Sequence, residues 1–424
     1  MMTEQQYLGQ DRTILIVTHV IPYPPAAGNE IRIMSMINWL KSAGFRIVLL
    51  LKHYDLPAET ITLLEEKIGV VHTLAGRGAS EGRKSLVGSA AKAVRRFFRM
   101  LDLLNHGMSW DYCRRSLEIK EGLCPQELVD MTRELVLRYR PAAVIAEYVF
   151  MAPCLARLPA GVLRIIDTHD MFSRKKEQVL AYGVDDPLFC SGGEERGYLL
   201  QSDVVMAIQS HEASMFRRLV PERKVISVGI DFCPVSGCDN FVASETVLIV
   251  GSDNPLNLLG LKQFISEAWP KIRKECPGAV FRVIGKIGAA VTAADDSVQK
   301  VGWVESLDEE YSRAAVVVNP VMAGTGLKIK SVEALCRGRA LVATPNSVEG
   351  IEYEHEPPYI VSADWDHFSS SVVTLLKDVS LRCELQARAS RYAEANFSPE
   401  KVYAPLSEVL ASVVYEKGRE VPVQ

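Results

Sequence analysis

Short apolar runs recur along the chain and are separated by longer amphipathic stretches. They cover 13–17, 46–51, 143–146, 163–167, 204–208 and 225–228 in the first half, then 247–251, 280–285, 315–320 and 340–345 in the second. Strands buried on both faces have such continuous runs, and helices between them indicate a parallel sheet. The pattern therefore predicts an α/β fold with two doubly wound, Rossmann-like domains.

The boundary between these domains is expected just after the first set of runs. The stretch 229–243 lacks periodicity and contains Pro234 and Gly237, which predicts a linker. With 424 residues the chain is also too long for one ordinary core. We expect a first domain over 1–235 and a second over 245–399, with ligands at the carboxyl ends of the strands, in a cleft between facing domains.

Composition excludes several classes of protein. A net charge of -4 argues against nucleic-acid binding. No apolar run reaches the roughly 18 to 20 residues that span a bilayer, and the polar stretch 1–12 has no signal-peptide core. The nine cysteines form no CxxC pair, which favours reduced thiols and a cytoplasmic protein without a metal site.

One basic stretch leaves two interpretations open. Residues 76–115 mix Lys and Arg with Phe, Met and Leu. They could form an amphipathic helix that lies on the inner face of the cytoplasmic membrane. They could instead form a helix that packs on its own domain and exposes its basic face, and this is the interpretation that we favour slightly.

The most informative motif is a glycine turn between two apolar runs. Gly324, Thr325, Gly326, Leu327 and Lys328 follow the run 315–320, and a predicted helix containing Lys330 and Glu333 comes next. Glycines let a ligand approach the backbone, and a helix N-terminus offers free N–H groups to an anion. A carboxylate one or two turns further on could accept hydrogen bonds from a sugar hydroxyl. The motif therefore predicts a site for a nucleotide sugar.

The first strand is followed by a different kind of loop. Residues 18–30 are rich in proline and end in Gly28 and Asn29, without a GxGxxG or Walker motif. This loop therefore argues against a nicotinamide dehydrogenase.

Four stretches together resemble the retaining GT-B glycosyltransferases, close to family 4. They are the loop 22–32, the strand end 167–170, the segment 302–304 and the glycine turn with its helix, 324–335. The resemblance covers nearly the whole chain, and the last stretch is the most specific. It implies a GT-B fold in which the final helix, within 400–424, crosses back onto the first domain.

The resemblance also implies roles for individual residues. In that family Glu333 would bind the donor ribose, and Lys328 with the amides near Thr325, Gly326 and Leu327 would hold the diphosphate. His169 would contact the transferred sugar. The other donor-binding positions would be Gly28 against the diphosphate, Gly285 and Trp303 beside the base, and Gly324 in the turn. The catalytic set is then His169, Lys328 and Glu333, with retention of configuration and no metal or cofactor.

The chain departs from the family pattern at two places. The family often has a second glutamate where this chain has Thr325, and many members have Arg and Lys after the first strand of the second domain, where this chain has 251–257 without either. Lys328 is then the expected phosphate cation, ahead of Lys330.

Each of these residues also has a plainer interpretation. Glu333 and Lys328 could be surface residues, Trp303 could be core, His169 could be structural, and Asp170 reads best as a helix N-cap. His19 is expected to be structural. The cluster Glu352, Glu354, His355 and Glu356 is expected to be a polar loop and not a metal site.

These expectations combine into one leading function and two alternatives. The leading one is a hexosyltransferase-type enzyme that moves a sugar from a nucleotide-diphosphate sugar to a saccharide or lipid-linked glycan, in polysaccharide or glycoconjugate biosynthesis. The alternatives are a nucleotide-sugar 2-epimerase of the same fold, which would need carboxylates such as Asp167 and Asp170, and a non-catalytic nucleotide-sugar-binding partner of a transferase.

Overall fold

The chain forms two compact α/β units. The computed structural model describes residues 12–25, 27–74, 97, 100–101, 109–232, 234, 244–291 and 295–417. The first unit consists of Met1–Lys176, Asp185–Val228 and Tyr403–Gln424, and the second of Glu177–Val184 and Gly229–Val402. Most of the basic stretch 76–115 lies outside the described residues, so neither interpretation of it is tested.

The first unit is built on a parallel sheet. Its described strands have the order β3-β2-β1-β4-β5-β6-β7. They are β1 Thr13–Thr18, β2 Arg46–Tyr54, β3 Val70–Leu74, β4 Ala143–Glu147, β5 Leu163–Asp167, β6 Val204–Ala207 and β7 Lys224–Ser227. The central strands are buried on both faces, as their continuous apolar runs predicted, and the core gathers around β1, β4, β5 and β6.

Helices connect and cover these strands. They are α2 Gly28–Ser42, α3 Ala58–Lys67, α5 Trp110–Leu123, α6 Gln126–Tyr139, η1 Val149–Leu155, α7 Phe172–Leu180, α8 Gly192–Leu199, α9 Ser210–Leu219 and α16 Pro399–Lys417. Of these helices, α7 contributes to this unit only up to Lys176, and the last helix contributes from Tyr403 onward. There the ring of Tyr403 stacks on Trp39 of α2, with centroids 4.7 Å apart.

The second unit repeats the plan with a smaller sheet. Its described strands have the order β10-β9-β8-β11-β12-β13, again with parallel pairs. They are β8 Thr246–Val250, β9 Val280–Ile284, β10 Val298–Gly302, β11 Val316–Asn319, β12 Leu341–Ala343 and β13 Ile360–Val361. The predicted α/β architecture with two doubly wound sheets is thus confirmed.

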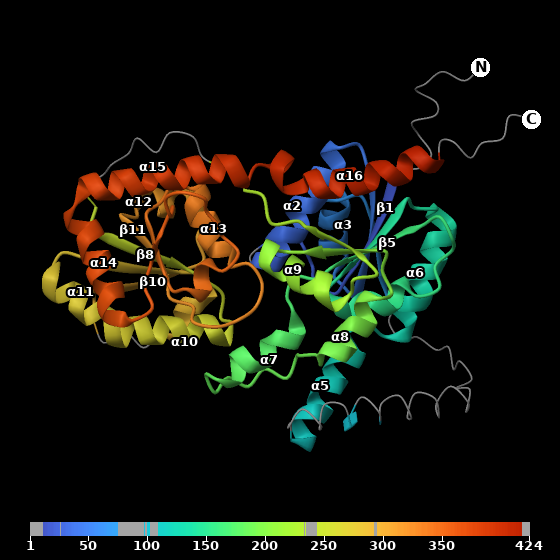
Figure 1. Ribbon diagram of the computed structural model, residues 1–424, viewed down its shortest axis with the longest axis horizontal. Coiled ribbons are helices and arrows are strands. Elements are labelled where there is room, and N and C mark those ends of the chain that lie inside the picture. Colours follow the sequence, from blue (N-terminus) through green and yellow to red (C-terminus); the bar gives the residue numbers. More distant parts are fainter. Residues whose placement is uncertain are drawn as a thin grey trace, which may run out of the picture. The chain divides into compact units, whose positions relative to one another are not determined.

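Helices flank this sheet on both faces. They are α10 Pro255–Gln263, η2 Phe264–Ala268, α11 Trp269–Glu275, η3 Lys286–Ala290, α12 Leu307–Arg313, α13 Ile329–Cys336, η4 Asn346–Val348, α14 Trp365–Lys377 and α15 Val379–Asn396. In Figure 1, α12 and α13 lie above the strands and α10 lies below them. In the part of the chain that the structure describes, no helix has both the length and the apolar character required to cross a bilayer.

Candidate functional site

The glycine turn lies where the sequence predicted it, at the carboxyl end of β11 and before α13. Gly324 and Gly326 have φ values of +118° and +76°, a region that side-chain-bearing residues rarely adopt. A Cβ on Gly324 would also come within 3.1 Å of Leu256 Cδ1. The turn therefore requires glycine for its conformation, and the backbone of Gly324 is bonded at both ends: its N–H donates to Gln178 and its carbonyl accepts from Asn346.

Lys328 lies inside this turn. Its Nζ donates to the carbonyl oxygens of Gly324, Thr325 and Gly326 at 3.0, 3.1 and 3.0 Å. An ammonium group has three donors, so these three bonds hold the turn closed around the lysine. The positive charge is thus delivered to the glycine turn itself.

Glu333 is buried in α13, one turn beyond the start of the helix. Its Oε2 accepts a hydrogen bond from Lys330 Nζ at 2.8 Å, and the glutamate side chain is only 3% exposed. Tyr311 of α12 is also buried, and burial followed by the charge of Glu333 raises the pKa of Tyr311 well above its usual value. Glu333 is therefore not the solvated helix glutamate of the plainer interpretation.

A buried polar network supports the turn from below. Asn319 Nδ2 donates to Ser331 Oγ at 2.8 Å, and Ser331 Oγ donates to the carbonyl of Ser347 at 2.6 Å. The hydroxyls of Thr344 and Ser347 both donate to the carbonyl of Val321. These bonds connect the ends of β11 and β12 to α13, so they fix where the turn begins. Sequence reasoning missed this network, although Asn319 ending an apolar strand was a visible signal.

The two residues assigned to the base have different surroundings. Gly285 has φ +90°, and a Cβ there would lie 2.3 Å from the backbone oxygen of Gly251, so this glycine lets two strand ends cross closely. Trp303 follows β10 and is 79% exposed. The indole is therefore a surface group open to stacking and not part of the core.

Gly28 lies in the first unit and is the first residue of α2. The helix start is held by Glu30, whose Oε2 accepts a hydrogen bond from the Ala27 amide at 2.8 Å. Gly28 thus occupies the N-terminus of a helix, as the loop 18–30 suggested.

His169 follows β5 and belongs to a buried cluster in the same unit. Its Nε2 lies 2.6 Å from Oε2 of Glu147, at the end of neighbouring β4. Its ring stacks on Tyr148 with centroids 4.1 Å apart and planes 2° from parallel. His169 and Tyr148 both have positive φ values, +58° and +73°. Backbone strain of this kind often accompanies functional sites.

Arg32 completes the cluster. Its Nε and Nη2 donate to the two carboxylate oxygens of Asp167 at 3.1 and 2.6 Å, and its Nη1 donates to the carbonyl of Val228 at 2.7 Å. Both side chains are buried, at 2% and 0% exposed. A planar guanidinium matches a carboxylate in this bidentate way.

Burial shapes the electrostatics around the histidine. Desolvation, reinforced by the charge of Asp167, raises the pKa of Glu147. Desolvation, followed by the electrostatic influence of nearby His169, lowers the pKa of His19 to about 4. The ring of His19 also contacts Tyr148, with centroids 4.9 Å apart and the planes tilted by 57°. It is thus a largely buried neutral histidine, in line with the structural role predicted for it.

Glu147, Asp167 and His169 are close enough to be tested as a metal site. Their ligand atoms lie within 4.8 Å of one another. However, Asp167 already binds the guanidinium of Arg32, and His169 Nε2 already faces Glu147. A cation would have to displace a buried positive charge, so this donor set fits an ion pair and not a metal.

The helix after His169 is anchored by a residue that the sequence did not single out. The amides of Phe172 and Ser173, which begin α7, donate to the two carboxylate oxygens of Glu195 at 2.8 and 3.0 Å. Burial raises the pKa of Glu195 to about 7. The sequence suggested Asp170 as the N-cap of this helix, whereas the amides of its first two residues donate to Glu195.

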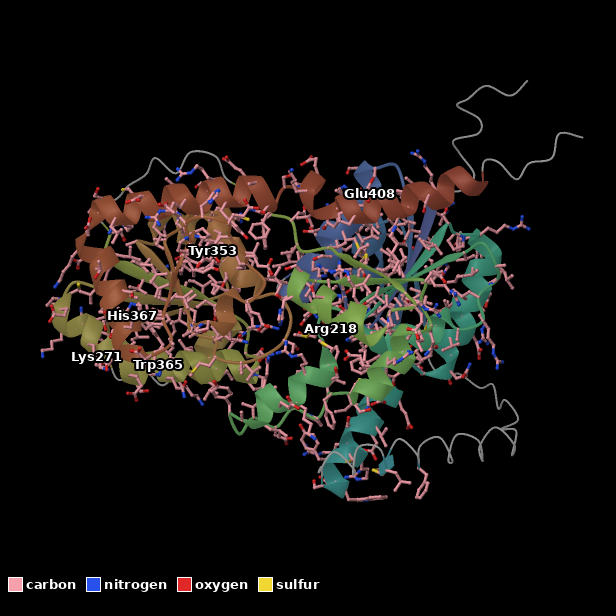
Figure 2. The ribbon with its side chains drawn as sticks, in the orientation of Figure 1. Arg218, Lys271, Tyr353, Trp365, His367 and Glu408 are labelled. Carbon is pink, nitrogen blue, oxygen red and sulfur yellow. The ribbon has the colours of Figure 1, made fainter. Side chains whose placement is uncertain are left out.

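The acidic loop 352–356 borders a hollow of about 830 Å³ against α15. Figure 2 labels Tyr353 on this loop. Glu356 pairs with Arg388 at 3.3 Å, and the carbonyl of Glu352 accepts a hydrogen bond from Tyr392 at 2.6 Å. These contacts belong to a polar surface loop, as the sequence suggested.

Comparison with known proteins gives a family match for part of the chain. Residues 244–378 match the sequence model of the glycosyl transferases group 1, a stretch that contains the glycine turn, Lys328 and Glu333. A relative from Klebsiella pneumoniae, described as an uncharacterized 44.6 kDa protein in the cps region, is 24% identical over 173 residues. That alignment covers 38% of this chain and 44% of the relative.

Solved structures match over almost the full chain. Sucrose-phosphate synthase from Thermosynechococcus elongatus superposes with a TM-score of 0.68 at 15% identity, covering 96% of this chain and 100% of that one. HepE from Anabaena, solved in complex with UDP and glucose, gives a TM-score of 0.63 at 13% identity, covering 95% and 100%. At such identities the likeness shows the fold. The chain therefore has the GT-B fold of these glycosyltransferase structures, and its residues 244–378 match the model of the glycosyl transferases group 1.

Proposed function

We propose that the chain transfers a glycosyl group from a nucleotide-diphosphate sugar to a saccharide or lipid-linked glycan acceptor. The observation that carries this proposal is the glycine turn before α13, with Glu333 buried behind it and a polar network beneath it. This turn lies within the stretch that matches the glycosyl transferases group 1. The cps-region relative supports a place in polysaccharide or glycoconjugate biosynthesis.

The donor would be bound by groups of the second unit. The carboxylate of Glu333 would accept hydrogen bonds from ribose hydroxyls, and the amides of Thr325, Gly326 and Leu327 would hold the diphosphate. The ammonium group of Lys328 lies on the carbonyl oxygens of the turn and places a positive charge beside the diphosphate position. Exposed Trp303 would stack on the base.

Transfer would proceed with retention of configuration and without a metal. As the bond between the sugar and the diphosphate breaks, negative charge develops on the leaving phosphate. Oriented N–H groups and the lysine charge stabilise that charge more than they stabilise the intact donor, which lowers the barrier. The departing diphosphate would take the proton of the acceptor hydroxyl. His169 of the first unit would contact the transferred sugar.

Partners and location follow the same proposal. HepE was solved in complex with UDP and glucose, so uridine-diphosphate sugars are the first donors to test here. The acceptor would be a saccharide or a lipid-linked glycan, met in the cytoplasm or at the inner face of the membrane. Contact with that membrane through 76–115 stays a prediction.

One observation favours a second candidate, the non-catalytic binding partner. Both lysines of the motif are already engaged, Lys328 with the turn and Lys330 with Glu333. A protein that binds a nucleotide sugar but lacks a free phosphate cation would have this arrangement. The epimerase alternative gains no such support, because Asp167 is bound by Arg32.

A turnover assay separates these candidates. Release of nucleoside diphosphate is measured with UDP-glucose, GDP-mannose and ADP-glucose, with and without oligosaccharide acceptors, for the wild type and Glu333→Ala. Glu309→Ala is the matched control, since Glu309 is an exposed glutamate of α12 in the same unit. Loss of hydrogen bonds to a charged group predicts about 10- to 100-fold lower kcat/KM for Glu333→Ala. Equal turnover in both variants would refute the donor assignment.

A further inference from the structure

The Glu147–His169 pair has features that the proposed transfer does not by itself explain. Glu147 ends β4 and is 0% exposed, and its register partner across the sheet is Asp167 at the end of β5. One oxygen of Glu147 faces His169 Nε2 at 2.6 Å. The other, Oε1, is buried and has no hydrogen-bond partner among the described residues. A buried carboxylate with a bare oxygen is costly, which points to a proton in the pair.

The histidine ring is held in one orientation. Tyr148 has φ +73° and ψ +145°, and His169 has φ +58°. Each costs of order 1–3 kcal/mol for residues other than glycine. Their rings stack almost in parallel. Turning the imidazole out of this plane would break the stack, and flipping it by half a turn would break the contact of Nε2 with Glu147. Nδ1 is therefore the nitrogen left for another partner.

The charges of the cluster indicate that the Glu147–His169 pair holds one added proton. Arg32 and Asp167 cancel each other in their bidentate pair. Ionised Glu147 beside a neutral His169 would then leave one uncompensated negative charge fully buried. One added proton removes it, whether the proton sits on the carboxyl or on the imidazole. Burial and the charge of Asp167 both raise the pKa of Glu147, which also favours a protonated pair.

Both protonated forms have the same consequence for Nδ1. If Glu147 keeps the proton, it donates to Nε2, and the neutral imidazole then has its hydrogen on Nδ1. If the imidazole takes the proton, both ring nitrogens have one. Only loss of the proton turns Nδ1 into an acceptor. The groups that face the pair are Arg32 of α2, Asp167 of β5, Asp170 after it, His19 after β1, and Tyr148.

We propose that Glu147 is a positioning residue that retains one proton on the Glu147–His169 pair, so that His169 Nδ1 donates a hydrogen bond to an oxygen of the transferred sugar. The sugar contact rests on the proposed function, whereas the protonation of Nδ1 does not. Glu147 itself does not touch the sugar and acts through the imidazole.

The test is a 15N–1H long-range correlation spectrum of the full chain labelled at its eight histidines. The His169 signals are assigned by their absence in His169→Asn. At pH 7 the spectrum is expected to show a protonated Nδ1, with a change to an unprotonated Nδ1 only at higher pH. Glu147→Gln conserves the size and removes the titratable carboxyl, so this change with pH should disappear.

Activity provides a second readout. Glu147→Leu is expected to lower kcat about 10- to 100-fold with a smaller effect on KM, and Glu147→Gln to recover much of the loss and to flatten the pH profile. An unprotonated Nδ1 in the wild type at pH 7 would overturn the proposal even if transfer occurs. A protonated Nδ1 in a protein that turns over no donor would instead refute the proposed function and leave the proton assignment standing.

Discussion

Removing Arg32 is expected to destabilise the first unit strongly. Arg32→Met keeps most of the side-chain volume and removes the charge. Three hydrogen bonds disappear, two to Asp167 and one to the carbonyl of Val228. The carboxylate of Asp167, 0% exposed, is then left without its cation. Breaking a buried pair from one side costs about 3–5 kcal/mol, and we expect the free energy of unfolding to fall by that amount.

The measurement must resolve the two units. Hydrogen exchange followed by mass spectrometry across a urea series reports β1, β4 and β5 separately from the second sheet. Arg164→Met is the matched control, because Arg164 forms a similar bidentate pair with Asp203 in the same sheet, but with the side chains 32% and 36% exposed. That pair should contribute no more than about 1 kcal/mol.

A double variant checks the physical reason for the loss. Arg32→Met with Asp167→Leu removes both charges, so most of the lost stability should return. A loss below about 1 kcal/mol in Arg32→Met alone would refute the reasoning. So would a double variant that is less stable than the single one.

Three further predictions concern buried groups and one glycine. Glu195 has a folded pKa of about 7, above its unfolded value, so the folded protein loses stability as pH rises from 4.5 to 7. In urea titrations the free energy of unfolding of Glu195→Gln should therefore rise by about 3 kcal/mol relative to that of the wild type between pH 4.5 and 7.5. A difference between the two proteins that stays constant with pH would contradict this. His19 has a folded pKa of about 4, below its unfolded value, so the folded protein loses stability as pH falls from 6.5 toward 4. His19→Gln should remove at most about 3 kcal/mol of this pH-dependent loss of stability. The same loss of stability at low pH in the variant would argue against a neutral buried ring. The two effects oppose each other in the same range, so each is taken from the difference between wild type and variant. Gly285→Ala should lower the melting temperature far more than Gly302→Ala, because a Cβ at 285 meets the oxygen of Gly251 at 2.3 Å whereas one at 302 meets nothing within 4 Å. Equal decreases in melting temperature would mean that the positive φ value alone sets the cost of each substitution.

The apolar runs predicted the buried strands well but missed three edge strands, β3, β10 and β13. β1, β4, β8 and β11 are nearly continuous apolar runs, which parallel strands covered on both faces require. β3 contains His72 and Thr73, and β10 contains Gln299 and Lys300. Both are edge strands, so polar side chains are tolerated and the apolar pattern is broken.

The glycine turn and the helix after it were predictable because their residues are contiguous. Glycines, a lysine and a glutamate within 324–333 are enough to indicate a turn and a helix start. The partners of these residues were not predictable. Nothing in the sequence shows that Lys328 bonds the carbonyl oxygens of its own turn, since that depends on the φ values of Gly324 and Gly326.

The sequence predicted the position of His169 but not the buried partners around it, for a different reason. Arg32 and Asp167 are 135 residues apart, and Glu147 and His169 are 22 apart on neighbouring strands. Each pair depends on the strand order, which a single sequence does not establish. Signals did exist, because Arg32 interrupts the apolar face of its helix and Glu147 ends an apolar run. A charge at such a position is expected to have a buried partner.

We expect Glu333 and the glycine turn to form a nucleotide-sugar donor site. The most direct measurement is the thermal shift of the wild type, Glu333→Ala and the control Glu309→Ala with uridine, guanosine and adenosine diphosphates. A nucleotide at about a hundredfold excess over Kd should stabilise the folded protein by roughly 2.7 kcal/mol. We predict a clear shift with one nucleotide in the wild type and the control, and its loss in Glu333→Ala. No shift with any nucleotide, or an equal shift in all three proteins, would contradict the account.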